Sequence, residues 1–381
     1  MEHCKWDPQV GDQTTLAPFP VFISEADWAE VAECAKALGA EVLAAESELL
    51  YRTDLHHRLG LPAALRREFA RSPRVLETPS FARTMRFDFH FTADGWRVSE
   101  VNSDVPGGFS EAEGFAGLMA RHFTAARMPG YPASSWAKSV ASVLPNGGGV
   151  ALLSTPGYME DAQVVAYLAQ FLRARGFSTR LIGPSELRWA AGRAFLDGRP
   201  DPLAAIVRFY QLEWLTRLPA AGRWPLLLFD GVTPVCNAGR AGLSESKRFP
   251  LVCHELRAKL PTFSRLSPEV RDPRDAAFAR PDSWVLKASF SNCGDAVIAR
   301  DWVSRSSWQG AWARALLNPN GWVAQRKFDA LRLDTTLGPL THCLGVYVID
   351  GDVAGAYLRL SRERFVGYTA MDAALLVVKD E

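Results

Sequence analysis

The chain has 381 residues and an almost balanced charge, with 43 Lys and Arg residues against 42 Asp and Glu residues. Its length is enough for about two or three structural units around a large core. The charge balance argues against a protein that binds nucleic acid or a membrane surface, and no apolar run is long enough to span a bilayer. The start lacks the apolar segment of a signal peptide, so we expect a cytoplasmic protein whose six scattered cysteines form neither disulfides nor a zinc site.

Two helices are expected in the first part of the chain. Ser24 can cap a helix over residues 22–48, in which Ala and Leu are frequent, and a second helix is expected over residues 62–72. His56 and His57 lie between these helices, and no third ligand follows at a recognisable spacing. A surface or capping role is therefore favoured over metal binding for this histidine pair.

A β-hairpin is expected next, over residues 85–102. Apolar and polar residues alternate over residues 85–91, which is the period-two pattern of a strand with one apolar face. Asp94-Gly95 is a turn signal, and its glycine suits the left-handed position of a three-residue loop over residues 93–95. This loop would pair residue 88 with residue 100, and residue 86 with residue 102.

The polar face of this hairpin is the first candidate site. Directly paired residues share a face, with Cβ atoms about 4.5–5.5 Å apart. The pairing therefore gathers Arg86, Asp88, Glu100 and Asn102. Two adjacent carboxylates repel each other unless a cation lies between them, and Mg²⁺ prefers such oxygen ligands together with substrate phosphates. The alternative is a solvated face on which Arg86 neutralises the acids, and a two-residue loop would remove the site by placing Asp88 and Glu100 on opposite faces.

A loop at residues 106–108, a helix over residues 111–126 and an α/β unit over residues 150–235 follow. The expected elements of this unit are a strand over residues 150–153, a helix from Glu160 that Gly176 closes, and a strand over residues 178–182. Gly147 to Gly149 precede the first strand, whereas a phosphate-binding glycine loop follows one. We therefore interpret these glycines as a turn.

Two lysines in the C-terminal part are suited to binding phosphate. Lys247 follows Ser244-Glu245-Ser246, where a helix could begin, and Lys287 ends a β-like apolar run. The small residues at positions 289–294 follow Lys287 and could close over phosphate with their backbone N–H groups. Each lysine taken alone is also typical of an exposed surface residue.

One arginine on an expected C-terminal strand is suited to an oxyanion. Arg359 follows the Asp350-Gly351 turn, and by alternation it shares a face with Tyr357. A guanidinium group binds oxyanions through two parallel hydrogen bonds, which suits the charge that develops on a transferring phosphoryl group. The nearby Arg362 and Arg364 are expected in a solvated turn.

Five segments in the same order resemble the glutathionylspermidine synthase family, and together they extend over residues 80–378. These segments are Arg86-x-Asp88 with Glu100-x-Asn102-x-Asp104, Arg208 to Trp214, Asn237 to Lys247, Val285 to Lys287 with Gly294, and Val346 to Gly351 with Gly355 and Arg359. Members of this family join a carboxylate to an amine through an acyl phosphate. The family's best-known bacterial member also has an amidase domain, for which this chain has no room.

The resemblance implies a role for each matching residue. It implies that ATP and Mg²⁺ are bound, that Arg86 orients the substrate carboxylate, and that Arg359 stabilises the phosphate charge. The implied metal ligands are Asp88, Glu100 and Asn102, and the implied ATP contacts are Lys247, Lys287, Gly294 and Gln325, the last beside the adenine. An amine then attacks the acyl phosphate, which yields an amide, ADP and phosphate.

The resemblance also implies a fold and a division of the chain. We expect an α/β fold, a circularly permuted ATP-grasp with an inserted pre-ATP-grasp-like α/β unit that forms one wall of the acceptor pocket. The expected parts are an N-terminal helical segment at 1–79, an ATP-grasp part with the metal hairpin at 80–129, the inserted unit at 130–235 and a nucleotide-binding part at 236–381.

One departure from the family concerns the substrate. The glutathione-using enzymes carry small hydroxyl side chains just after the Asn-x-Asp segment, whereas this chain has Val105-Pro106-Gly107-Gly108. The substrates could therefore be an amino acid, a small peptide or another acid, with a primary amine as the acceptor. Two other functions stay open: a degenerate ATP-grasp protein that binds nucleotide or peptide without turnover, and an ATP-dependent phosphotransferase with a stable phosphorylated product.

Overall fold

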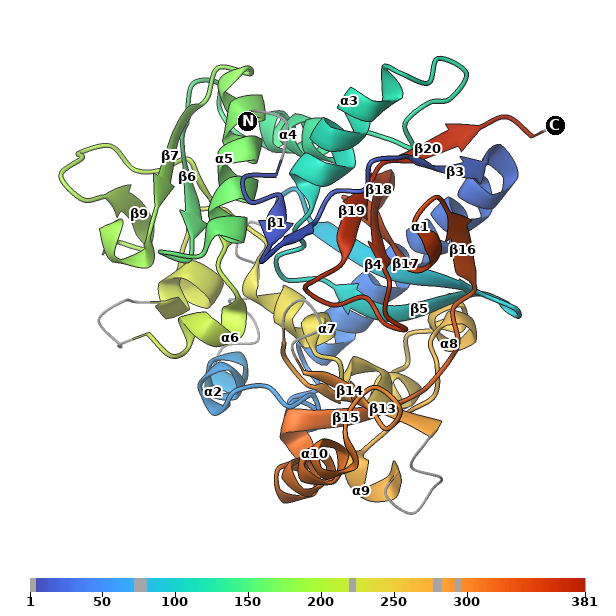
Figure 1. Ribbon diagram of the computed structural model, residues 1–381. Helices are drawn as coiled ribbons and strands as arrows, with labels where there is room; N and C mark the ends of the chain where they lie inside the picture. The colour runs from blue at the N-terminus through green and yellow to red at the C-terminus, as the bar shows by residue number, and fades with distance from the viewer. Residues whose placement is uncertain (1–4, 72–80, 219–223, 277–282, 292–295, 381) are drawn as a thin grey trace.

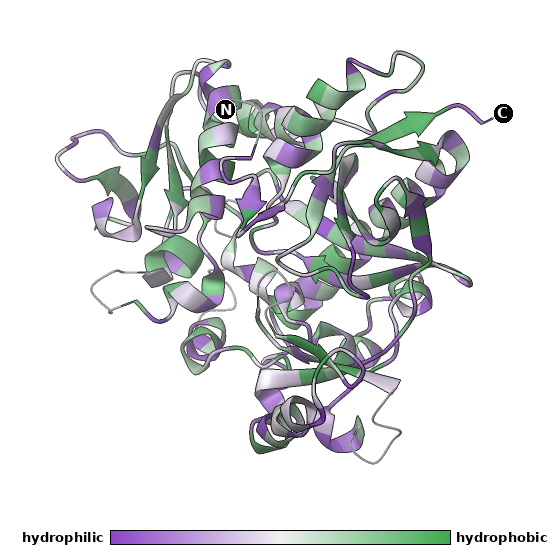
Figure 2. Ribbon diagram, in the orientation of Figure 1, coloured by the Kyte–Doolittle hydropathy of each residue, from purple (hydrophilic) through white to green (hydrophobic). Residues whose placement is uncertain are grey.

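The computed structural model describes residues 5–71, 81–218, 224–276, 283–291 and 296–380. In these residues the chain forms three main sheets with helices packed on them, which confirms the expected mixed α/β class (Figure 1). Hydrophobic residues run along strands in all parts of the fold, and strands of the central sheet also carry hydrophilic residues (Figure 2). Among the described helices, none has the length and apolar character needed to cross a membrane.

The central sheet is antiparallel and contains the expected hairpin. Its strand order is β19-β18-β17-β4-β5, and β16 pairs with β17. The strands are β4 (Thr84–Thr92), β5 (Gly95–Asn102), β16 (Arg332–Thr335), β17 (Gly338–Ile349), β18 (Asp352–Ser361) and β19 (Met371–Ala373). The turn between β17 and β18 is the expected Asp350-Gly351 turn, with both residues at positive φ. The hairpin and the C-terminal strands therefore lie side by side, although more than 200 residues separate them in sequence.

Helix α1 (Glu25–Leu49) covers one face of the central sheet, as Figure 1 shows. Ser24 caps this helix by accepting a hydrogen bond from the backbone N–H of Asp27, as the sequence predicted. Gly39 allows the close approach, since a Cβ there would lie 2.9 Å from a methyl carbon of Val348. The second expected helix is α2 (Ala63–Arg71). His56 is buried and its Nε2 lies 2.7 Å from the Leu49 carbonyl at the end of α1, which is a capping contact.

The second sheet is parallel and corresponds to the expected α/β unit. Its order is β11-β10-β6-β7. The elements are β6 (Gly149–Ser154), α5 (Met159–Arg173), β7 (Ser178–Ile182), β10 (Ala205–Phe209) and β11 (Val235–Cys236), with the small hairpin β8 (Leu187–Ala190) and β9 (Arg193–Leu196) between them. Strands β6 and β10 are buried on both faces, which explains their continuous apolar runs. The helices α4 (Pro132–Val143), α5 and α6 (Leu212–Leu215) accompany this sheet.

The third sheet is antiparallel and carries Lys287 and Gln325. Its order is β12-β15-β13-β14. The elements are β12 (Val270–Arg271), α9 (Pro273–Ala276), β13 (Trp284–Ala288), β14 (Val297–Ala299), α10 (Arg305–Leu317) and β15 (Trp322–Arg326). Trp308, Ala311 and Ala315 form the buried face of α10 and pack against the sheet in a separate small core. The helices α7 (Gly242–Glu245) and α8 (Pro261–Leu266) precede this sheet.

The N-terminal segment returns to the C-terminal strands. The elements are β1 (Gln9–Val10), β2 (Gln13–Thr14), β3 (Val21–Ser24) and β20 (Leu375–Val378), and β3 pairs in parallel with β20. The backbone at Thr15 and Ala17 also bonds to the backbone of Asp372, which holds the segment against β19. This return brings residues near position 5 to the central sheet.

Two expected helices differ from the structure. The helix expected over residues 111–126 is a π-helical turn (Ser110–Phe115) followed by α3 (Ala116–Ala120). It ends early because Arg127 makes two backbone hydrogen bonds with Val377 on β20, which takes the chain out of the helix. A helix was expected to begin near Ser244, but α7 already ends at Glu245. Lys247 therefore lies in the segment that follows this helix.

Candidate active site

The hairpin pairs the expected residues, but its turn and its regularity differ from the expectation. Asp88 lies opposite Glu100, and Arg86 lies opposite Asn102, as predicted. The turn is nevertheless one residue shorter than expected, because Thr92 already pairs with Gly95. A β-bulge at Ser99 adds the missing residue and restores the register before Glu100. The expected loop length was therefore wrong, while the expected pairs are confirmed.

Asp88 lies buried between two arginines. Its carboxylate accepts hydrogen bonds from Arg86 Nε at 2.8 Å and from Arg359 Nη2 at 2.8 Å. Burial opposes the charged form of Asp88, but the two guanidinium groups outweigh burial and hold the pKa of this carboxyl well below its usual range. The expected face of β18 is confirmed, since Arg359 and Tyr357 line the same pocket while Leu358 and Leu360 are in the core.

A glycine on the neighbouring strand makes room for Arg86. Gly345 lies opposite Asp88 on β17, and a Cβ there would approach Arg86 Cδ to 2.6 Å. Arg86 also donates a hydrogen bond of 3.0 Å to the carbonyl of Gly107, in the loop after the hairpin. The guanidinium group is thereby held at a fixed position beside the carboxylate of Asp88.

The end of the hairpin is anchored to the parallel sheet. The carboxylate of Asp104 forms a buried ion pair with Arg208, which lies on β10. The side-chain amide of Asn237 donates to the carbonyls of Thr84, Ser103 and Asp104. These bonds connect two sheets at one point, so the loop from residue 103 to residue 108 has a defined position.

Glu100 lies between the two predicted ATP lysines. The ammonium group of Lys247 is 3.5 Å from Glu100 Oε2, and it donates a hydrogen bond of 2.9 Å to the carbonyl of Ser291. Burial lowers the pKa of Lys287, whereas Lys247 has a raised pKa because Glu100 and Glu245 outweigh its burial. The two lysines therefore approach the hairpin from different segments, and their contact with ATP stays a prediction.

Lys287 and Gln325 meet the hairpin at its bulge. Lys287 Nζ donates to the carbonyl of Ser99 at 3.2 Å, and Gln325 Nε2 donates to the same carbonyl at 3.0 Å. The bulge thus presents a backbone acceptor to the third sheet. Gly294, which the sequence assigned to the phosphate loop, lies outside the described residues.

Two adjoining pockets of opposite charge lie on either side of Glu100 and Arg359, which line both. The basic pocket has five basic and two acidic side chains, namely Lys287, Arg326, Lys327, Arg359 and Arg364 with Asp88 and Glu100. Gln325, Phe328 and the stacked pair Trp302 and Phe365 complete its wall. Its excess of positive charge suits a polyphosphate.

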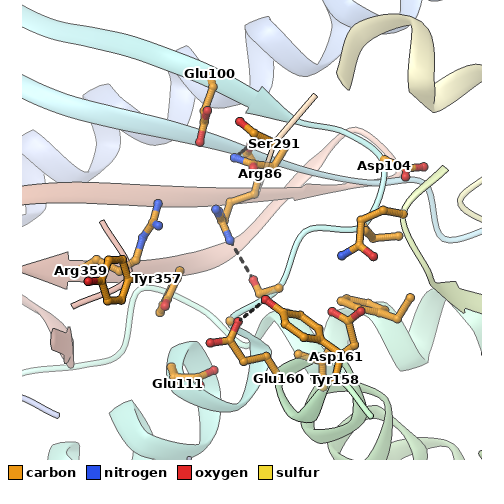
Figure 3. A pocket seen from close by; sticks show the side chains of 18 of the residues that line it. Arg86, Glu100, Asp104, Glu111, Tyr158, Glu160, Asp161, Ser291, Tyr357 and Arg359 are labelled. Carbon is orange, nitrogen blue, oxygen red and sulfur yellow. Dashed lines mark hydrogen bonds between the residues drawn. The ribbon is translucent and has the colours of Figure 1, made fainter. Parts of the chain in front are cut away.

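The acidic pocket has eight acidic and four basic side chains. They are Glu100, Asp104, Glu111, Glu160, Asp161, Glu213, Glu245 and Asp372, with Lys5, Arg86, Lys247 and Arg359. Figure 3 shows Arg86 and Arg359 reaching into this pocket below Glu100. Glu111, Glu160 and Asp161 lie on the side of the pocket away from Glu100 (Figure 3).

Sequence reasoning missed most of this acidic wall. Burial raises the pKa of Asp161 and of Glu213 to about 7, and that of Glu245 to about 8. The wall combines residues from the helices α5, α6 and α7, the π-helical turn and β19, so no local sequence pattern predicts it. The only signal in the sequence is that Glu160, Asp161 and Glu213 fall in segments next to strand ends.

The predicted magnesium ligands form a set of oxygen donors, which is the type that Mg²⁺ takes in proteins. Within the described residues, however, no group of three or more His, Cys, Asp and Glu side chains is arranged to hold a metal ion. Asp88 and Glu100 would contribute carboxylates and Asn102 an amide oxygen, with substrate oxygens completing the shell. Oδ2 of Asp88 accepts hydrogen bonds from both arginines, whereas Oδ1 accepts one from Arg86 and keeps a second lone pair for a cation. The donors fit the ion through this oxygen, and the ligand set stays a prediction.

Comparisons with known proteins show the family and the fold. Residues 18–373 match the family model described as glutathionylspermidine synthase preATP-grasp. Over 95% of this chain and 90% of the other, the fold is similar to that of a glutathione synthetase-like effector from Globodera pallida in its apo form, with a TM-score of 0.67 and 13% identity. A protein assigned as a gamma-glutamylcysteine synthetase from Methylobacillus flagellatus KT matches at a TM-score of 0.47 and 15% identity, over 88% of this chain and 86% of that one. No curated protein sequence matches the chain.

Proposed function

Because the chain belongs to the glutathionylspermidine synthase family, we propose that it is an ATP-dependent ligase that joins a small carboxylic acid to an amine through an acyl phosphate. Family membership and the ATP-grasp-related synthetase fold indicate a synthetase-type enzyme that acts on small molecules. The observation that carries the finer proposal is the pair of oppositely charged pockets that share Glu100 and Arg359.

The charges of the two pockets support a division of substrates. A triphosphate fits the basic pocket, where Lys287 and its neighbours offset the phosphate charge. An ammonium group fits the carboxyl-rich wall of the acidic pocket. The reacting phosphoryl group must then lie at the boundary, next to Arg359.

Each residue at the boundary has a defined task in the proposed reaction. Arg86 holds the substrate carboxylate, which attacks the γ-phosphorus of ATP, so that ADP leaves and an acyl phosphate forms. Arg359 stabilises the charge of the transferring phosphoryl group. Mg²⁺, if bound to the oxygen donors of the hairpin, would neutralise part of the phosphate charge.

The second half of the reaction uses the acidic pocket. The amine must lose a proton before it attacks the acyl carbon, and Asp161 and Glu213, with pKa values near 7, can accept it. The new C–N bond forms as inorganic phosphate leaves. We also propose a division of the chain into parts at 1–79, 80–129, 130–235 and 236–381. In this division the part at 130–235 contributes the wall that faces the amine.

A substrate screen tests this function directly. The protein is incubated with ATP and Mg²⁺ and with pairs of carboxylic acids and primary amines, while ADP release is followed and products are identified by mass spectrometry. ADP release that requires both an acid and an amine, with an amide of the summed mass, is the expected result. ADP release with the acid alone and a stable phosphorylated product would show a phosphotransferase, and nucleotide binding without ADP release from any pair would show a binding protein.

A further inference from the structure

The N-terminal segment places a lysine inside the acidic pocket. Lys5 lines this pocket, and its ammonium group forms an ion pair of 2.8 Å with Asp372 on β19. The two partners are 367 positions apart in sequence. The Lys5 side chain is only 18% exposed, and that of Asp372 is 3% exposed. A surface lysine would leave its ammonium group in water, whereas this one is directed into a substrate pocket.

Neighbouring contacts fix the position of this ammonium group. The backbone N–H of Trp6 donates a hydrogen bond of 2.6 Å to Gln163 on α5. Gln163 in turn donates to Glu111 at 3.0 Å, so the residue that follows Lys5 is connected to the acidic wall. Burial disfavours the ammonium form, but Asp372, Glu111 and Glu160 outweigh burial and raise the pKa of Lys5 above its usual value.

The Asp372 subsite does not need Lys5 for its shape. The hydroxyl of Tyr357 donates a hydrogen bond of 2.6 Å to Asp372 Oδ1, while Lys5 contacts the other carboxylate oxygen. The backbone N–H of Asp372 bonds to Thr15, and its carbonyl accepts from Ala17. Removal of the lysine ammonium would therefore leave a positioned carboxylate with one open oxygen.

We propose that Lys5 is a built-in occupant of an ammonium subsite centred on Asp372, and that it determines which amines the acidic pocket accepts. The inference rests on the proposed function, because it assigns this pocket to the amine. An acceptor with a cationic tail must displace Lys5 before the tail can reach Asp372. Since a tethered group competes at an effective concentration on the order of millimolar, dilute diamines are disfavoured.

Binding of 1,4-diaminobutane tests the subsite without any turnover. Lys5→Gln removes the competitor and keeps a side chain of similar length, and we expect it to bind this dication at least about 10-fold more tightly than the unaltered protein. The neutral isostere 1,4-butanediol should show no gain. Lys36→Gln is the matched control, because Lys36 lies on an exposed part of α1 with a side chain 55% exposed.

Further variants protect the test against a folding artefact. Lys5→Arg keeps the cation and should behave like the unaltered protein, and adding Asp372→Asn to Lys5→Gln should abolish the gain. Equal diaminobutane affinity in Lys5→Gln and the unaltered protein would overturn the proposal, as would a gain that survives loss of the Asp372 charge.

Kinetics separate this inference from the proposed function. If the protein is a ligase, Lys5→Gln should lower KM for 1,4-diaminobutane and change kcat by less than about twofold, since the reacting groups are untouched. A lowered kcat with unchanged KM would contradict the inference. A binding gain without ADP release in either protein would support the ammonium subsite while it contradicts the ligase function.

Discussion

At the scale of single residues, Asp88 has two tasks that the sequence alone does not separate. It is a predicted metal ligand, and it also neutralises the guanidinium groups of Arg86 and Arg359. The alternation of apolar and polar residues predicted which face Asp88 occupies. It could not predict Arg359 as a partner, because that contact crosses a sheet between strands far apart in sequence. The space for Arg86 likewise depends on Gly345, a distant glycine that no local pattern marks.

Asp88→Asn is expected to reduce both activity and stability. The substitution leaves two buried cations without their shared anion, and breaking a buried pair in this way costs about 3–5 kcal/mol. Because the pKa of Asp88 is lowered in the folded protein, its stabilising effect exists above the unfolded-state pKa and is lost as pH falls. Thermal unfolding at pH 7 should therefore show a lower midpoint for the variant, and the difference should shrink in acid.

Asp352→Asn serves as the control for Asp88→Asn. The Asp352 side chain is 84% exposed and pairs only with an exposed lysine, so its loss should leave the unfolding midpoint almost unchanged. An Asp88→Asn variant with full activity and the unfolding midpoint of the parent would contradict both tasks assigned to this residue.

Lys287 and Arg359 should respond differently to truncation. Lys287 lines the basic pocket from its wall, so Lys287→Ala should weaken binding of a non-hydrolysable ATP analogue about 10- to 100-fold. Arg359 lies at the boundary, so Arg359→Ala should lower the rate about 100- to 1,000-fold and change nucleotide affinity less. Calorimetry and ADP-release kinetics distinguish the two effects, with the exposed Lys379→Ala as control. Unchanged nucleotide affinity in Lys287→Ala would show that this lysine does not contact ATP.

At the scale of elements, α7 and β5 are connected through one carboxyl group. Glu245 at the end of α7 accepts hydrogen bonds from the backbone N–H groups of Ser103 and Asp104, at 2.6 Å and 2.8 Å. Burial, reinforced by the Asp104 carboxylate, raises the pKa of Glu245 to about 8. The segment that carries Lys247 is thus attached to the hairpin by a group that titrates near neutral pH.

Glu245→Gln should change the pH dependence of stability. Between about pH 4.5 and pH 8 the folded protein keeps a proton that the unfolded chain has lost, so the stabilising effect of Glu245 declines as pH rises. Glutamine keeps an acceptor oxygen without the charge. The variant should therefore match the parent near pH 5 and unfold at a higher temperature near pH 8. An equal change of the unfolding temperature at both pH values, or no change at either, would contradict this assignment. Glu30→Gln, on the exposed side of α1, is the control.

Elements with strong local signals were predicted correctly, and those decided by distant contacts were not. Strand β7 has the expected bounds, and Ser24 caps α1, because alternation and capping act within a few residues. The helix after the hairpin is shorter than expected because β20 takes over the backbone at Arg127. Local propensity could not reveal this competition, since it involves a strand near the other end of the chain.

At the scale of the whole molecule, the reaction class was accessible from sequence but the substrate pocket was not. Five spaced segments identified the family, because their residues and their order along the chain match it. The acidic pocket instead combines side chains from the central sheet, from the helices of the α/β unit and from Lys5 near the start of the chain. Only the tertiary structure brings these residues together, so the pocket proposed to bind the amine could not be predicted from the sequence.

The family's namesake reaction is expected to be slow or absent in this protein. The resemblance implies a hydroxyl group in glutathione-using enzymes where Gly107 offers only a backbone N–H, and Lys5 lies in the proposed amine pocket, paired with Asp372. A pocket that lacks a partner for a substrate group discriminates against that substrate by roughly 10⁴-fold or more. Incubation with ATP, Mg²⁺, glutathione and spermidine, followed by mass spectrometry, measures the conjugate. Its efficient formation would contradict this expectation.

Because of the bulge, the pairing of Asp88 with Glu100 does not depend on the presence of Ser99. If Ser99 were deleted, a regular ladder continued from the short turn would still set Glu100 opposite Asp88, because the bulge is the one extra residue between two matched halves. What would be lost is the carbonyl that Lys287 and Gln325 share. The hairpin could thus be shortened without a change in its polar face, but the third sheet would lose this connection to the hairpin strands.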